Sequence, residues 1–295
     1  MNIDFYDLDF YQLLLISAFV LFFLTQMGYY LGLFSRVAFY KRKIQLTDAP
    51  HEGISVIICA RNERDNLERL LPKILEQNYS KFEVIVVNDC STDDSEDVFN
   101  LLKTKYDNLD TRKITLTDGI SRNNSIMWGV GIKAAKYEWI VITDANCYPD
   151  NENWLTTLQK NFNTKTDLVI SYTSRRGSKL VRAGNFADAL YYLSKACGGK
   201  TYTASGNNMA FRKSVFYENK GFHPLLKVYD TADAVFANTI AKKDNTVVDL
   251  SAEAINNSAF KFSFEKWKIK RRDELRSQRL FRSGTKNASC FEMFT

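Results

Sequence analysis

The chain has 295 residues, which is enough for one large domain or two small ones. Hydrophobic residues make up 45% of the chain and aromatic residues 14%, a composition that excludes an intrinsically disordered protein. The net charge of +6 fits an anionic substrate or an anionic membrane surface, and it is too small to indicate a nucleic-acid-binding protein.

The first predicted element is an uncharged, apolar segment from Phe10 to Ser35, long enough to cross a hydrocarbon layer of about 30 Å as a helix. Basic side chains follow this segment and none precede it; they are Arg36, Lys41, Arg42 and Lys43. The positive-inside rule therefore predicts that residues 1–43 form an anchor with its basic flank. The protein would be single-pass, in the inner or plasma membrane, with the following domain in the cytoplasm. The alternative is a buried helix of a soluble protein.

Beyond this segment, short β-branched runs alternate with segments of helical periodicity. The expected strands are 54–59, 84–87, 139–142 and 168–172, with a weak edge strand at 112–116, and the expected helices are 67–77, 95–105, 127–135 and 153–161. Asp65 or Asn66 is expected to cap the first of these helices. The alternation predicts an α/β fold with a Rossmann-like, mostly parallel sheet flanked by helices. We assign residues 50–275 to this domain and 276–295 to a basic C-terminal tail.

Two of the predicted strands end in a carboxylate. Val84–Val87 is followed by Asn88 and Asp89, and 139–142 is followed by Thr143 and Asp144. Ligands of open α/β sheets bind outside the carboxyl ends of such strands. Two acidic groups at that edge indicate a site for a nucleotide and a divalent cation.

Four segments occur in an order and spacing that carry a family resemblance. They are Ile54-Ser-Val-Ile-Ile-Cys-Ala-Arg-Asn-Glu63, Val86-Val-Asn-Asp-Cys-Ser-Thr-Asp93, Thr143-Asp-Ala-Asn-Cys-Tyr-Pro149 and Ser205-Gly-Asn-Asn-Met-Ala-Phe-Arg-Lys213. The chain resembles the family 2 glycosyltransferases of the GT-A fold over roughly residues 50–275. The resemblance implies an inverting, membrane-anchored enzyme. Such an enzyme would move a sugar from a UDP-linked nucleotide-sugar donor to a lipid-linked or cell-surface polysaccharide acceptor.

The resemblance also implies the residues that hold the donor. Asp89 would accept hydrogen bonds from the uracil and ribose region, although this residue is also placed to cap the following helix. The other residues implied to contact the nucleotide sugar are Ala60, Arg61, Glu63, Arg122, Asp144, Gly206 and Asn207. Arg122 stands where relatives carry a lysine, and the Gly206 segment is either a sugar-lining loop or an ordinary tight turn.

Asp144 and Asn146 occupy the positions of the family's Asp-x-Asp signature, which implies a bound Mg²⁺ or Mn²⁺. The asparagine brings no negative charge, so metal binding should be weaker than in the family pattern. The alternative for Asp144 is a turn aspartate that hydrogen-bonds its own backbone.

The family pattern further implies a catalytic base, for which Asp233 is the first candidate and Asp230 the second. The alternative for Asp233 is a capping role at a helix start. In the basic segment after Trp267, the residues Lys270, Arg271 and Arg272 resemble a diphosphate-binding stretch. The same segment, with Phe260, Phe262, Phe264 and Trp267, would equally suit a helix lying on the cytoplasmic leaflet, and a plain solvated helix is the third reading.

Three positions depart from the family pattern: Asn146, the acidic cluster around Asp233, which has few acids, and Arg122. These departures leave a second functional hypothesis open. The chain would then be a catalytically weak or inactive relative that serves as a nucleotide-binding or assembly subunit.

Overall fold

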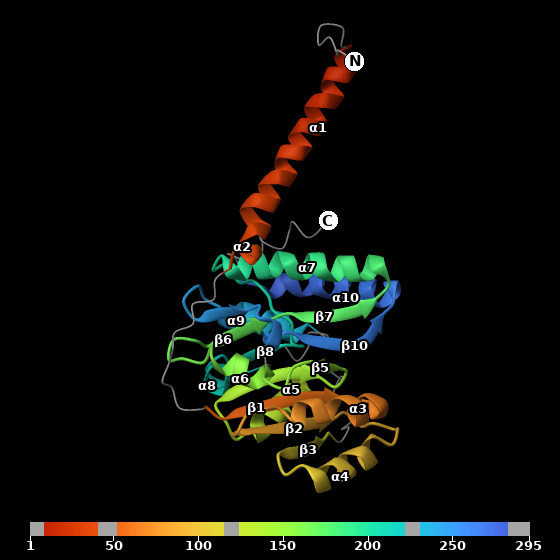
Figure 1. Cartoon of the computed structure of the whole chain (residues 1–295), viewed down its shortest axis with the longest axis vertical. Coiled ribbons are helices and arrows are strands. Elements are labelled where there is room, and N and C mark those ends of the chain that lie inside the picture. Colours follow the sequence, from red (N-terminus) through yellow and green to blue (C-terminus); the bar gives the residue numbers. More distant parts are fainter. Residues whose placement is uncertain (1–8, 41–51, 115–123, 222–230, 283–295) are drawn as a thin grey trace.

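A seven-stranded sheet with the order β3-β2-β1-β4-β8-β6-β9 forms the centre of the domain (Figure 1). Its strands are β1 (Ile54–Ala60), β2 (Phe82–Asn88), β3 (Leu109–Lys113), β4 (Trp139–Asp144), β6 (Leu168–Ser171), β8 (Met209–Arg212) and β9 (Thr246–Asp249). Strands β3, β2, β1 and β4 are parallel, β8 runs antiparallel to both of its neighbours, and β9 is parallel to β6. The computed structural model describes residues 9–40, 52–114, 124–221 and 231–282.

A second, three-stranded sheet with the order β5-β10-β7 lies beside the central sheet. Its strands are β5 (Cys147–Pro149), β7 (Thr173–Gly177) and β10 (Asn256–Phe262). The helices of the domain are α3 (Arg64–Leu75), α4 (Ser95–Lys105), α5 (Asn124–Ala134), α6 (Trp154–Gln159), α7 (Lys179–Cys197), α8 (Lys213–Glu218), α9 (Ala232–Ile240) and α10 (Phe264–Ser277), with short 3-10 turns at η4 (Ala252–Ala254) and η5 (Gln278–Leu280). The expected mostly parallel sheet flanked by helices is confirmed.

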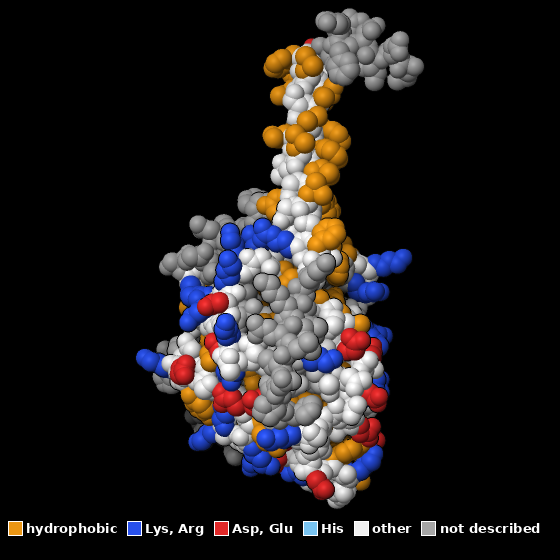
Figure 2. Space-filling view, turned by 60° about the vertical axis from the view of Figure 1, so that its left-hand side comes forward, with side chains coloured by type: hydrophobic (Ala, Val, Ile, Leu, Met, Phe, Trp, Pro, Cys, Tyr) orange, Lys and Arg blue, Asp and Glu red, His pale blue; other side chains and the backbone are white. Residues whose placement is uncertain are grey.

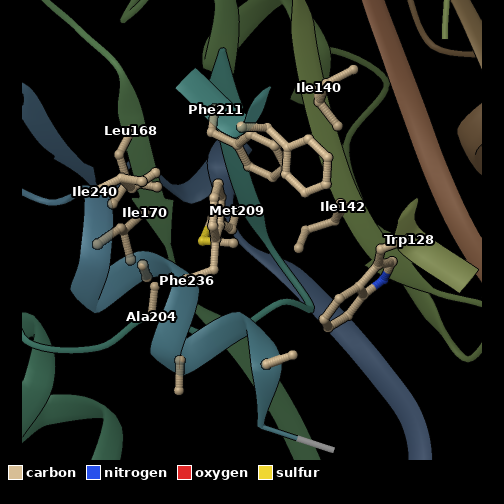
Figure 3. Packing of buried hydrophobic residues seen from close by; sticks show 14 of the residues in the cluster. Trp128, Ile140, Ile142, Leu168, Ile170, Ala204, Met209, Phe211, Phe236 and Ile240 are labelled. Atoms are coloured by element: carbon tan, nitrogen blue, oxygen red, sulfur yellow. The ribbon is translucent and has the colours of Figure 1, made fainter. Parts of the chain in front are cut away.

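Each face of the central sheet buries its own apolar cluster, because the side chains of successive strand residues point to opposite faces. One cluster includes Trp128 of α5, Phe211 of β8 and Phe236 of α9 (Figure 3), and the ring centroids of Phe211 and Phe236 are 4.9 Å apart. The other cluster lies under α3, α4 and α6, where Trp139 stacks on Phe162 with 3.7 Å between the ring centroids. Strands β1 and β2 are buried on both faces, which explains why β-branched residues predominate in both.

Two predicted boundaries move for identifiable reasons. The edge strand lies at Leu109–Lys113 rather than 112–116, because the buried Leu109 pairs with Val84 of β2. Helix α3 begins at Arg64, so the predicted cap at Asp65 or Asn66 is wrong. At the other end of the chain, residues 276–282 pack on the domain, since Phe281 is 4% exposed and contacts Tyr202. This part of the predicted C-terminal tail therefore contacts the domain.

The N-terminal segment is a single long helical rod that projects from the domain (Figures 1 and 2). It consists of α1 (Phe10–Tyr29), a π-helical turn η2 (Tyr30–Phe34) and α2 (Ser35–Ala38). No residue of α1 is buried, whereas Leu33 of η2 is, because η2 and α2 pack on α7. By length and composition, Phe10–Ala38 is the one helix among the described residues that could cross a membrane.

Candidate functional site

The loops after β2, β1 and β4 meet at the carboxyl edge of these parallel strands. The register sets Cys59 of β1 opposite Asp144 of β4. The β1–β2 ladder continues into the loops, because the Asp89 N–H donates to the Ala60 carbonyl at 3.0 Å. The segments that carry the predicted nucleotide and metal residues therefore form one continuous edge.

Hydrogen bonds clasp the first two of these loops together. The Asn62 N–H donates to Ser91 Oγ at 3.0 Å, and the Thr92 N–H donates to Asn62 Oδ1 at 2.8 Å. Asn62 has a φ of 51°, a left-handed conformation that asparagine tolerates better than most residues. The Arg64 N–H donates to Asp93 Oδ2 at 3.1 Å, so the other loop supplies an acceptor for the first turn of α3. This clasp preorganises the edge before any ligand arrives.

Asp89 lies within this edge and is 7% exposed. Its Oδ2 atom is 4.0 Å from Nη1 of Arg61, whose side chain is 44% exposed. Helix α4 begins at Ser95 with Asp94 at the N-cap position, so Asp89 does not cap it. A buried carboxylate beside a half-exposed guanidinium suits polar contacts to a nucleoside.

Two other predicted donor contacts, Ala60 and Glu63, lie on the same edge, whereas two predicted site residues cannot be placed. Ala60 is 1% exposed and its carbonyl is used in the β1–β2 ladder, whereas Glu63 lies in the clasped loop and accepts a hydrogen bond from Asn66 Nδ2 at 2.5 Å. Arg122 and Asp230 lie outside the described residues.

Asp144 ends β4 with a carboxylate that has no hydrogen bond or ion pair to any other described residue. The pKa of Asp144 is raised to about 6, first by burial and then by the nearby carboxylate of Asp233. Arg175 and Lys270 act in the opposite direction on this pKa. The alternative reading of Asp144 as a self-bonded turn residue finds no support in this geometry.

A divalent cation fits at Asp144, because a half-buried carboxylate without a hydrogen bond or ion pair is stabilised by positive charge. Asn146 is a weaker ligand, since its Oδ1 already accepts a hydrogen bond from Ser258 Oγ at 3.0 Å. Within the described ranges, no group of three or more acidic, histidine or cysteine side chains gathers at one point. A cation held here would need further oxygen ligands from a substrate, as Mg²⁺ commonly takes from phosphates.

Asp233 lies in the first turn of α9 and reaches the 205–208 turn. The Gly206 N–H donates to Asp233 Oδ2 at 2.6 Å. Burial raises the pKa of Asp233, and the N–H groups of Gly206 and Ala234 lower it in part. A Cβ atom at Gly206 would lie 3.0 Å from both Asp233 Oδ2 and the Trp128 ring, so glycine allows this close approach. Asp233 combines a helix-start position with a fixed orientation toward the site.

The segment around Gly206 is a tight turn that also lies beside β4 and β5. The Asn208 N–H donates to the Ser205 carbonyl, which closes the turn. The Asn207 carbonyl accepts a hydrogen bond from Asn256 Nδ2 at 2.6 Å, and Asn207 Nδ2 donates to Cys147 Sγ at 3.3 Å. The segment is therefore a tight turn that stands next to the Asp144 edge, and its contact with a sugar stays a prediction.

A cavity of about 100 Å³ opens on the other side of Asp233, between β7, α7, α9, α10 and residues 202–205. Sequence reasoning missed Arg175 of β7, which lines this cavity and donates to Ser205 Oγ at 3.4 Å. The signal available was the polar pair Arg175-Arg176 just after the strand predicted at 168–172.

Helix α10 divides its predicted basic residues between two faces. Lys270 and Arg271 line the cavity, where Lys270 Nζ is 3.5 Å from Glu274 Oε1 and Arg271 Nη1 is 3.4 Å from Asp188 Oδ1. Burial lowers the pKa of Lys270. The side chain of Arg272 is instead 56% exposed and pairs with the next residue of the helix.

Residues 55–220 match the model of a protein family described as glycosyl transferase family 2. Among curated proteins, a poly-beta-1,6-N-acetyl-D-glucosamine synthase of Staphylococcus aureus is 30% identical over 34% of this chain and 23% of its own length. The UDP-Glc:alpha-D-GlcNAc-diphosphoundecaprenol beta-1,3-glucosyltransferase WfaP of Escherichia coli is 30% identical over 36% of this chain and 38% of its own. The matches thus span well under half of these relatives.

Among solved structures, a mannosyltransferase from Pyrobaculum calidifontis in complex with GDP-Man and Mn²⁺ superposes with a TM-score of 0.68. The two chains are 18% identical, and the superposition covers 88% of this chain and 71% of the other. The likeness confirms the expected GT-A fold.

Proposed function

Because this chain belongs to glycosyl transferase family 2, we propose that it transfers a glycosyl group from a nucleotide-sugar donor, UDP-linked, to a lipid-linked or polysaccharide acceptor at the membrane. The observation that carries the proposal is the position of Asp144. Its unpartnered carboxylate stands between the clasped loops of the predicted nucleotide site and Asp233.

The donor side of the proposal rests on the sheet edge. Asp89 and Arg61 would contact the base and ribose, with Glu63 in the same clasped loop. Asp144 would hold a Mg²⁺ or Mn²⁺ ion together with the diphosphate oxygens, and Asn146 would contribute little because Ser258 already engages its oxygen. When bound, such an ion supplies positive charge that stabilises the departing diphosphate. The mannosyltransferase of similar fold was solved with GDP-Man and Mn²⁺, which supports a nucleotide sugar with a cation at this edge.

The transfer step needs a group that takes the proton of the acceptor hydroxyl, and we assign this role to Asp233. The Gly206 N–H donates to Asp233 Oδ2 at 2.6 Å and so fixes the orientation of the carboxylate. Burial raises the pKa of Asp233 and so makes its carboxylate a stronger base. An acceptor hydroxyl placed between Asp233 and the donor carbon would lose its proton to this carboxylate while attacking the carbon.

The cavity beside Asp233 is the proposed acceptor site. Two residues that line it, Thr173 and Asn185, each carry a buried polar atom (Oγ1 and Nδ2) without a hydrogen-bond partner among the described residues. Such groups suit the hydroxyls of a sugar. Trp267 supplies an aromatic wall. The exposed apolar helix α1, proposed as a membrane anchor, ends on α7, which forms part of the same cavity, so a lipid-linked acceptor fits this location.

The experiment is calorimetric titration of UDP into the detergent-purified chain with and without Mn²⁺, beside Asp144→Ala. We expect Mn²⁺ to strengthen UDP binding in the wild type and to have no effect in the variant. GDP titrated in parallel tests the donor class, and tighter binding of GDP would overturn the uridine assignment. No metal-dependent binding of either nucleotide would overturn the donor site.

Transfer is tested separately with Asp233→Asn. We expect UDP binding within about twofold of wild type and loss of at least 100-fold in turnover, the usual size of a general-base contribution. Wild-type binding with no turnover on any lipid-linked acceptor would identify the second hypothesis, a nucleotide-binding subunit without activity.

A further inference from the structure

The N-terminal rod enters the domain without a linker. The 20 residues of α1 span about 30 Å at 1.5 Å per residue, which matches the hydrocarbon layer. The next turn, η2, already packs on α7 through the buried Leu33. The Arg36 side chain then lies against the backbone of Gly198 at the end of α7. If α1 spans the membrane, as proposed above, α7 is held within about two helical turns of the membrane surface.

The surface around α7 concentrates exposed apolar side chains. Beyond the rod, the described domain has seven large hydrophobic side chains that are exposed, and five of them lie on α7, α10 and η5. These five are Leu180 (71% exposed), Phe186 (55%), Phe264 (51%), Ile269 (51%) and Leu280 (53%). Helices α7 and α10 lie side by side at the end of the domain nearest α1, in contact through Gly184 and Trp267 (Figure 1). We call this surface, formed by the exposed side chains of α7, α10 and η5, the platform.

The platform is also basic. Its exposed cationic side chains are Lys179, Arg182, Lys266, Lys268, Arg272, Arg276 and Arg279. Four of them follow the helical spacing of 4, 4 and 3 residues from 268 to 279, so they form one stripe. The carboxylate that pairs with this stripe is Asp273, 3.2 Å from Arg272 Nε and 3.7 Å from Arg276 Nη1. Lysine and arginine side chains gather where the rod meets the domain (Figure 2).

We propose that the platform docks on the anionic phospholipid headgroups of the leaflet into which α1 is inserted. Exposed aromatic and aliphatic side chains between basic ones are the pattern of a helix that lies in the membrane interface. The geometry also divides the segment after Trp267 between two roles: Lys270 and Arg271 face the cavity, whereas Lys268 and Arg272 face outward. Docking would hold the cavity mouth at a constant height above the leaflet.

The test uses the full chain in nanodiscs made of phosphatidylcholine alone or with one third phosphatidylglycerol. The readout is tryptophan quenching by phosphatidylcholine brominated near the headgroup end of its acyl chains. Trp267 is half-buried at the contact between α7 and α10, beside the platform, whereas Trp128, Trp139 and Trp154 are at most 2% exposed inside the domain. The variant Trp267→Phe therefore provides the background. We expect quenching of Trp267 to rise with phosphatidylglycerol and to fall in 1 M salt, which shortens the screening length to about 3 Å.

The platform variant is Lys268→Glu/Arg276→Glu/Arg279→Glu, which leaves out Arg272 because that residue belongs to the predicted diphosphate-binding stretch. Its matched control is Lys103→Glu/Lys160→Glu/Lys165→Glu, which makes the same charge change at exposed lysines elsewhere. At about fivefold to tenfold in membrane partition per basic residue, the platform variant should lose the phosphatidylglycerol-dependent quenching while the control keeps it. UDP binding in detergent should be unchanged in both variants, which separates this inference from the donor site.

Two results would overturn the inference. Quenching that is equal in both lipid mixtures, or equal in the platform and control variants, would show that the platform does not bind anionic lipid. Flotation with vesicles at alkaline pH tests the anchor itself. A chain that does not float would overturn the anchor together with the platform, whereas flotation without lipid-dependent quenching would overturn the platform alone.

Discussion

Asp144→Asn should stabilise the metal-free protein while removing its metal-dependent nucleotide binding. The pKa of Asp144 is raised from 3.8 to about 6, first by burial and then by Asp233. A shift of about 2 units corresponds to about 3 kcal/mol by which the folded state disfavours the charged carboxylate. Because an amide also needs hydrogen bonds when buried, we expect a net gain of about 1–3 kcal/mol at pH 8.

The sign of the pH dependence follows from the raised pKa. Between about pH 4 and pH 6 the unfolded carboxyl is ionised while the folded one keeps its proton, so the wild-type free energy of unfolding falls as pH rises. Above pH 6 this loss is complete. The advantage of Asp144→Asn should therefore be largest above pH 6 and vanish near pH 4.

The assay is urea unfolding of both proteins in detergent with EDTA, followed by near-ultraviolet circular dichroism at pH 4, 6 and 8. Calorimetric UDP titration with Mn²⁺ on the same samples measures the lost function. A variant that is less stable than wild type at pH 8 would refute the reasoning, because it would mean that the carboxylate stabilises the fold. A difference in the free energy of unfolding that does not change between pH 4 and pH 8 would also refute the reasoning.

Three further predictions test neighbouring contacts. Gly206→Ala should reduce turnover by about tenfold or more with little change in UDP binding. The Cβ of the alanine would lie 3.0 Å from Asp233 Oδ2 and disturb the proposed base. Steady-state kinetics measure the turnover, and calorimetry measures the UDP binding. Arg175→Gln should move the pH midpoint of Mn²⁺-dependent UDP binding upward, because Arg175 lowers the pKa of Asp144. Calorimetric titrations from pH 5 to pH 8 measure this midpoint. A downward shift would contradict the assignment of Asp144 as the group that binds the cation. Asn208→Ala should lower the free energy of unfolding in urea by about 1–3 kcal/mol. Asn208 Nδ2 donates to two backbone carbonyls, at 3.0 and 2.8 Å, and both would lose this partner. A change under about 0.5 kcal/mol would contradict a stabilising role of these two hydrogen bonds.

The course of the central strands could be predicted because it depends on local composition. β1, β2 and β4 are short, β-branched and bounded by turn residues, and all three appear where expected. Helix α4 has its predicted bounds, 95–105, since an acidic first turn and basic last turn mark its two ends. The start of α3 escaped prediction because its acceptor, Asp93, comes from a different loop.

Sequence alone thus determined the α/β class, the apolar N-terminal helix and the placement of Asp89 and Asp144 at the carboxyl ends of two parallel strands, which the structure places on either side of β1. These features follow from the period and composition of contiguous residues. Only the tertiary structure decided that Gly206 orients Asp233, that Arg175 lies near Asp144, and which face of α10 meets the cavity. Such contacts join segments that are distant in the chain, and they depend on how helices pack on a sheet rather than on any local period.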